Sequence, residues 1–394
     1  MSGALDGIRV IDTTTMISGP ICTRILADQG ADVVKVEAPG VGDLVRVMGA
    51  RRDGLSATFV TSNRNKRSVV IDLKQKEGLS LLERLVATAD VFVQNFRPGA
   101  AERMGIGEEA LRKIRPDLVY CSISGFGEKG PYAHKRVYDP VVQALSGLAA
   151  IQADRDTGRP RMVRLIVPDK LTAITAAQAI TAALFHRERT GEGQHLRLAM
   201  LDAMVAFAWP EGMAGHTFIG EGQRDRRARY AQDLIFETAD GYLTAGAVSD
   251  SEWKGLCRAI EHEEWLEDPR FETAAGRIMH AGDRLMMTAE VFRARTTAEW
   301  LERLEAEDVP SAPVLSRQDL LTHPQLEANE LVVESDHPVA GRMRQARPPE
   351  RFSATPSSLR RPAPSLGEHT TEIFEELGVD AEDLAALRAQ GVVA

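Results

Sequence analysis

The 394-residue sequence predicts an α/β protein that combines a parallel β-sheet with a second, smaller α+β domain. Two observations predict the sheet. Short apolar runs typical of buried strands alternate with segments of helical spacing through the first 123 residues, and glycines separate several of them. A third observation predicts the smaller domain, because a strong hairpin signal and acidic helices follow after about residue 230.

The first part of the chain consists of repeated strand–helix–strand units. Residues 8–12 form an expected buried strand, residues 19–28 a helix, and residues 33–37 a second strand after the break at Gly30. The further expected elements here are strands at 68–73, 91–93 and 118–123 and helices at 75–87 and 110–114. This succession predicts a parallel sheet with helices on both faces.

The rest of the chain contains one long helix and then a different kind of domain. An Ala- and Thr-rich helix is expected at 171–186, followed by a strand at 195–199 and a helix at 200–208. The Asp240-Gly241 dipeptide lies between two short strand patterns, which indicates a β-hairpin. We place the domains at 1–229 for the large domain, 230–325 for the small one and 326–394 for a linker and C-terminal helices.

Charge and composition narrow the possible functions. The net charge is −9, but residues 1–200 carry +6 and the remainder −15. A mildly basic half can bind a small phosphorylated ligand, whereas scattered cations without a stripe disfavour nucleic acid. The isolated Cys22, Cys121 and Cys257 support neither a disulfide framework nor a metal site. Without a signal-peptide pattern or a membrane segment, we expect a cytoplasmic protein with no membrane partner.

The fingerprints of several common α/β enzymes are missing. The turn after the first strand, residues 13–20, has no GxGxxG, so a standard NAD site is disfavoured. The chain also lacks GxxxxGK[ST], HExxH and GxSxG, which removes P-loop enzymes, zincins and α/β-hydrolases from consideration.

Eight short strings, in a fixed order from residue 5 to residue 370, together resemble the class III CoA-transferase (CaiB/BaiF) family. They are LDGIRVID (5–12), GP (19–20), GADVVKVE (30–37), NKRS (65–68), NFRPG (95–99), SGFG (124–127), TGEGQ (190–194) and LGEHT (366–370). The resemblance implies a Rossmann-like large domain built from both chain ends, a small inserted domain and an interlocked homodimer. It also implies acyl-CoA and carboxylic acid substrates, with no permanently bound cofactor.

The resemblance assigns the catalytic nucleophile to Asp169. On the residues alone, Asp169 is an N-cap for the following helix, and both roles are compatible because a helix N-terminus favours an ionised carboxylate. In the family mechanism, this aspartate attacks the donor thioester to give a mixed anhydride, and the released CoA thiolate then forms an aspartyl-CoA thioester. Some members close the site with a glycine flap, but residues 220–222 contain no glycine run, so no flap is assigned.

The resemblance also implies a set of residues that bind coenzyme A. The corresponding positions are Ile71, Lys74, Asn95, Phe96, Arg97, Arg103 and Arg136. The lysine and arginines can bind phosphate, and Phe96 can pack on the adenine. The alternatives are solvated surface charges and, for Phe96, core packing.

Three positions bear on the substrate. Tyr138 stands where the racemase branch of the family has a histidine, and a phenol is a poor base at neutral pH, so a transferase is favoured. Ile17 stands where formyl-CoA:oxalate enzymes have glutamine, and together with Met16 it favours a larger or less polar acid than oxalate. Two alternatives remain open: an acyl-CoA racemase, which would need another base such as His134, and a catalytically silent CoA-binding dimer.

Overall fold

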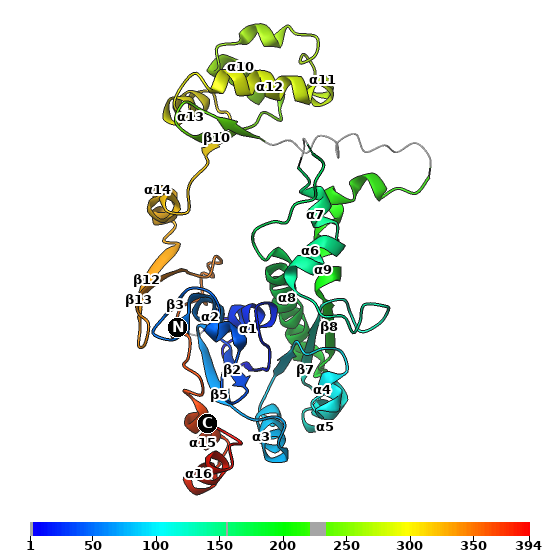
Figure 1. The fold of residues 1–394 in the computed structure, drawn as a ribbon, viewed down its shortest axis with the longest axis vertical. Helices are drawn as coiled ribbons and strands as arrows, with labels where there is room; N and C mark the ends of the chain where they lie inside the picture. Colours follow the sequence, from blue (N-terminus) through cyan, green and yellow to red (C-terminus); the bar gives the residue numbers. More distant parts are fainter. Residues whose placement is uncertain (1–2, 155–156, 221–233) are drawn as a thin grey trace. The chain divides into compact units, whose positions relative to one another are not determined.

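The computed structural model describes residues 3–154, 157–220 and 234–394, which form two compact units (Figure 1). The first unit combines Met1–Glu211 with Glu330–Ala394, and the second is Gly212–Asn329. The first unit is therefore built from both ends of the chain, with the second unit inserted between them. The predicted boundary at 229/230 and most of the segment considered for a flap lie outside the described residues.

The first unit contains a six-stranded sheet in the order β5-β2-β1-β6-β7-β8, and every neighbouring pair is parallel. The strands are β1 Arg9–Asp12, β2 Asp32–Glu37, β5 Lys66–Val70, β6 Val91–Gln94, β7 Val119–Ser124 and β8 His195–Ala199. The strand order reverses between β1 and β6. In such sheets a crevice for ligands forms outside the carboxyl ends of the two strands at this reversal.

Helices cover both faces of the sheet, so the α/β class is confirmed. On one face, α1 (Ser18–Asp28) and α8 (Val167–Thr190) bury residues such as Leu26 and Ile180 against the strands. The other face carries α3 (Lys76–Ala87), α5 (Glu108–Ile114), α15 (Thr370–Glu376) and α16 (Ala381–Ala389). Because both faces are covered, β2, β5 and β6 are buried along nearly their whole length, including charged residues such as Lys35 and Lys66.

The first unit contains further elements besides the sheet and the helices on its two faces. The remaining α-helices of this unit are α2 Ala57–Asn63, α4 Ala100–Arg103, α6 Asp139–Leu145, α7 Leu148–Ile151 and α9 Met200–Gly212. Two hairpins complete the unit, β3 (Arg51–Arg52) with β4 (Leu55–Ser56) and β12 (Val332–His337) with β13 (Gly341–Ala346). The helix expected at 171–186 is longer than predicted, because Pro168 suits its first turn and allows it to begin at Val167.

The second unit is a small α+β domain. Its sheet joins β9 (Ile235–Glu237), β10 (Tyr242–Ala245) and β11 (Ser311–Pro313), and the first two strands form the predicted hairpin. Its helices are α10 Asp250–Ala259, α11 Ala274–Met279, α12 Ala281–Phe292, α13 Thr297–Ala306 and α14 Pro324–Ala328. Reciprocal capping boxes start α10 and α13, and Trp253, Phe292 and Trp300 lie in the core.

Candidate active site

Asp169 is the third residue of α8, and Ile166 holds the N-cap position. The prediction that Asp169 caps this helix is therefore wrong, because the helix starts earlier than its Ala-rich stretch indicates. The backbone N–H of Asp169 instead donates to Asp139 Oδ2 at 3.2 Å. Asp139 is the buried first residue of α6, and its other oxygen accepts from Gln143 Nε2 at 2.6 Å. A second helix thus supplies the acceptor for the first turn of α8.

The Asp169 carboxylate is half-buried, and both the backbone N–H and the side chain of Ser18, the first residue of α1, favour its ionised form. Burial and the neighbouring charge of Asp139 raise the pKa of Asp169 to about 6, against the lowering effect of the Ser18 donors. At neutral pH the group remains mostly ionised, yet it is more basic than an ordinary aspartate, which suits a carboxylate nucleophile.

The loop between β1 and α1 leaves the sheet at the carboxyl end of β1, where the strand order reverses. The Asn95 side chain accepts from the Thr15 backbone N–H at 3.0 Å and donates to the Thr15 carbonyl at 2.8 Å. The next residue, Met16, has a φ of 70°, and Ile17 is buried. Asn95, a predicted CoA contact, therefore joins the ends of β1 and β6 next to the residues that reach Asp169.

The other predicted CoA residues occupy two kinds of environment. Lys74, Arg97, Arg103 and Arg136 are exposed. Arg103 lines a cavity of about 510 Å³ together with the cationic side chains of Lys113 and Arg197 and with His134. Four glutamates, Glu102, Glu108, Glu109 and Glu128, line the same cavity, so its charge does not by itself favour a phosphorylated ligand.

The two apolar members of the set lie largely in the core. Ile71 is 1% exposed and pairs with Val393 near the C-terminus, and half-buried Phe96 packs against the same cluster. The described contacts of Ile71 are therefore those of a core residue. Phe96 retains part of its ring at the surface.

Tyr138 and Ile17 each precede a residue that contacts Asp169. Tyr138 is 67% exposed and stands immediately before Asp139, and Ile17 stands immediately before Ser18. His134, the base that a racemase would need, is exposed and lines the cavity that contains Arg103. Within the described residues, no hydrogen bond or ion pair joins His134 to Asp169.

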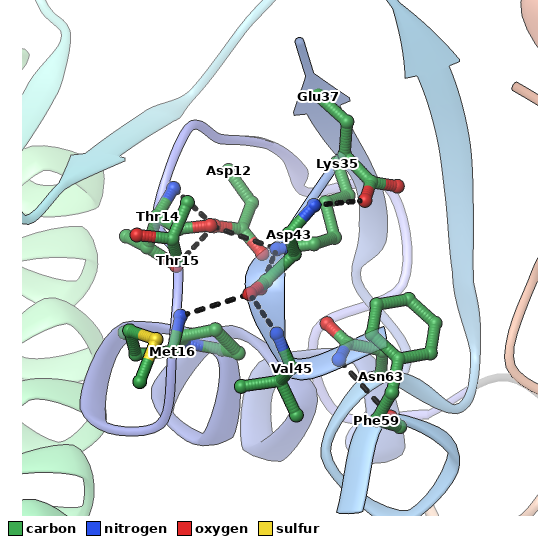
Figure 2. A network of polar contacts seen from close by, with 12 residues as sticks. Asp12, Thr14, Thr15, Met16, Lys35, Glu37, Asp43, Val45, Phe59 and Asn63 are labelled. Atoms are coloured by element: carbon green, nitrogen blue, oxygen red, sulfur yellow. Dashed lines mark hydrogen bonds and ion pairs between the residues drawn. The ribbon is translucent and has the colours of Figure 1, made fainter. Parts of the chain in front are cut away.

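Sequence reasoning missed Ser18, Asp139 and a buried ion pair between Lys35 and Asp43 (3.1 Å) beneath the β1–α1 loop, which Figure 2 shows. The available signal was Lys35 itself, because a lysine inside an otherwise apolar strand of a parallel sheet requires a buried partner. No comparable signal pointed to Ser18.

No helix among the described residues is long and apolar enough to cross a bilayer. No group of three or more His, Cys, Asp or Glu side chains in the described ranges gathers to hold a metal ion.

The geometry defines an α/β protein with a half-buried carboxylate in the first turn of α8, and comparison with known proteins identifies its class. The sequence model of CoA-transferase family III matches residues 5–370, so the chain belongs to that family and is a CoA-transferase.

Individual relatives agree over nearly the full length. The succinate–glutarate CoA-transferase of Agrobacterium fabrum is 36% identical, with 95% of each chain covered. The formyl-CoA:oxalate CoA-transferase of Escherichia coli is 33% identical, covering 98% of this chain and 99% of that one. The crystal structure of a CaiB/BaiF family protein from Brucella suis superposes with a TM-score of 0.82 at 31% identity, covering 96% of this chain and all of the other.

Proposed function

We propose that this CoA-transferase works through covalent intermediates on Asp169. A carboxylate oxygen of Asp169 attacks the carbonyl of the donor acyl-CoA, the C–S bond breaks and CoA leaves as a thiolate, which gives a mixed anhydride. The thiolate then attacks the aspartyl carbonyl and releases the donor acid as its carboxylate. The acceptor carboxylate attacks the resulting aspartyl-CoA thioester, and the same steps in reverse deliver the new acyl-CoA.

The observation that carries this proposal is the environment of Asp169. Its carboxylate lies against the two Ser18 donors, and burial together with Asp139 raises its pKa to about 6. Donors fixed at the start of α1 can stabilise the negative charge that develops on oxygen when the aspartyl carbonyl is attacked. Partial burial also limits the access of water, which both intermediates require because each hydrolyses readily.

We further propose that the acids are dicarboxylates larger than oxalate, with succinyl-CoA as a donor. The succinate–glutarate and formyl-CoA:oxalate relatives have similar identities, so similarity alone does not choose between them. Buried, apolar Ile17 favours the larger acid, because it offers no hydrogen-bond donor or acceptor to a compact, strongly polar oxalate. Coenzyme A is a substrate in this scheme, and the exposed cations Lys74, Arg97, Arg103 and Arg136 are the proposed phosphate contacts.

Transfer between succinyl-CoA and glutarate, followed by chromatography of the acyl-CoA products, tests the proposal. Asp169→Ala should abolish turnover while CoA still binds, because the variant leaves the phosphate contacts untouched. Full turnover in Asp169→Ala would contradict the role of this residue. Exchange of α-protons into heavy water without acyl transfer would instead favour the racemase alternative.

The chain's assembly and location are part of the same proposal. We propose a homodimer, because apolar side chains on α8 and α9 are left exposed, among them Phe185 and Phe207. The three cysteines are free and buried, which fits the reducing conditions of the cytoplasm.

A further inference from the structure

The loop that leads to Ser18 contacts two fully buried charged side chains, Lys35 and Asp43 (Figure 2). Lys35 and Asp43 are both 0% exposed, with Nζ and Oδ2 3.1 Å apart. Lys35 Nζ also donates to the Thr14 carbonyl at 2.8 Å. Asp43 Oδ1 accepts from the backbone N–H groups of Met16 and Val45, each at 3.1 Å. An ion pair this deeply buried adds little net stability, because desolvation offsets its attraction, so a role in fixing one conformation is the stronger explanation.

The conformation that these contacts fix is an unfavourable one. Met16 has a φ of 70°, in the left-handed region that side chains other than glycine rarely adopt. Asp12 holds the same loop from the other side, since its Oδ1 accepts from the N–H and the hydroxyl of Thr14 at 2.9 and 2.5 Å. Strain of this kind persists only where the surroundings enforce it, and it concentrates near functional sites.

The strained residue lies two positions before the donors to the nucleophile. The N–H and the side chain of Ser18 favour the ionised form of Asp169, so a rotation at Met16 would displace two groups that act on this carboxylate. We propose that Asp43 is a positioning residue: paired with Lys35, it holds Met16 in the left-handed conformation and thereby aims the Ser18 donors at the Asp169 carboxylate. This inference rests on the proposed role of Asp169.

The other end of α1 provides a matched control. Asp28, the last residue of the helix, is also buried and pairs with Arg64 at 2.9 Å. Both aspartates therefore make a buried ion pair in the same unit, but only Asp43 binds the loop before Ser18. Substitution of either aspartate should lower the stability of the fold, whereas only substitution of Asp43 should displace Ser18.

The experiment measures kcat and KM for CoA transfer from succinyl-CoA to glutarate, well below the unfolding temperature. Asp43→Ala should lower kcat about a hundredfold and leave KM for succinyl-CoA nearly unchanged, as expected when a catalytic group is misplaced by about an ångström. Asp43→Asn should lose less, because its amide oxygen can still accept from Met16. Asp28→Asn should lower the unfolding temperature and leave kcat unchanged.

A double-mutant cycle with Met16→Gly separates positioning from folding and remains usable if Asp43→Ala fails to fold. Glycine adopts a positive φ without strain, so the effect of Asp43→Asn on kcat should be smaller in the Met16→Gly background than in the wild type. Additive effects, an unchanged kcat in the Asp43 variants, or an equal loss in Asp28→Asn would each overturn the inference. Hydroxylamine labelling of Asp169 in the wild type is scored separately, and its absence would overturn the proposed mechanism and this inference together.

Discussion

Asp169 must be ionised to attack a thioester, yet its surroundings oppose ionisation. Burial and the charge of Asp139 raise its pKa to about 6. Ser18 acts in the opposite direction and favours the charged form. The residue was identified by resemblance, whereas Ser18 and Asp139 could not be identified from the sequence. Each reaches Asp169 from a different helix, and only the folded chain brings the starts of α1, α6 and α8 together.

The raised pKa predicts how activity depends on pH. In the proposed mechanism the ionised form is the nucleophile, so kcat/KM should fall about tenfold per unit as the pH drops below about 6 and should level off above it. Asp139→Asn removes the neighbouring negative charge, so the midpoint should move to lower pH. Rate measurements from pH 4.5 to 8 with the two proteins check this, and an unchanged midpoint in Asp139→Asn would contradict the electrostatic account.

The raised pKa also predicts that ionised Asp169 lowers the free energy of unfolding. The pKa of Asp169 is higher in the folded protein than its ordinary value of 3.8, so ionisation destabilises the fold as the pH rises from about 4 to about 6. Asp169→Asn should therefore raise the free energy of unfolding by about 1–3 kcal/mol at pH 7, with the gain disappearing below about pH 4. Urea unfolding at pH 7.5 and pH 4 measures this, and a gain of equal size at both values would point to packing instead.

At the scale of elements, short apolar runs predicted the strands of the sheet, but β5 is Lys66–Val70 rather than the expected 68–73, because its first three residues are polar and nevertheless buried. The start of α8 and the existence of α6 were missed. Both are set by tertiary contacts, since Asp139 accepts the backbone N–H of Asp169 and Gln143 binds the carbonyls of Val163 and Leu165. The spacing of apolar residues along the sequence does not indicate such contacts.

The close approach of α1 to the β1–α1 loop makes a prediction about Gly19. A Cβ at this position would lie 2.3 Å from Cβ of Thr14, so Gly19→Ala should destabilise the first unit by about 1–3 kcal/mol and lower turnover. Gly282 in α12 is the matched control, because a Cβ there meets nothing within 4 Å and alanine favours a helix. Denaturant unfolding should show no loss for Gly282→Ala, and equal losses in both variants would contradict the packing argument.

At the scale of the whole molecule, the ordered strings from residue 5 to residue 370 identified the family, and the family match covers the same span. Physical reasoning from the sequence could not predict that both chain ends form one unit, because short-range patterns do not report which distant segments pack together. The resemblance supplied that topology, and with it the proposed homodimer.

The proposed homodimer predicts the molar mass in solution and the surface at which charged substitutions should dissociate the subunits. Light scattering after gel filtration should give twice the 43.1 kDa of the chain. The pair of changes Phe185→Glu and Phe207→Glu places charges on the exposed apolar surface of α8 and α9 and should shift the protein towards the monomer. Met286→Glu, at an equally exposed position in the second unit, should leave the mass unchanged. A monomeric wild type at micromolar concentration would contradict the proposal.

The covalent role of Asp169 is the central claim, and trapping tests it most directly. The protein is incubated with succinyl-CoA, treated with hydroxylamine and digested, and the peptides are mapped by mass. If a mixed anhydride or a CoA thioester forms on this carboxylate, hydroxylamine should convert Asp169 to a hydroxamate. The hydroxamate should form only when acyl-CoA is present and should be absent from Asp169→Ala. An unmodified Asp169 in an enzyme that is turning over succinyl-CoA and glutarate would contradict the mechanism.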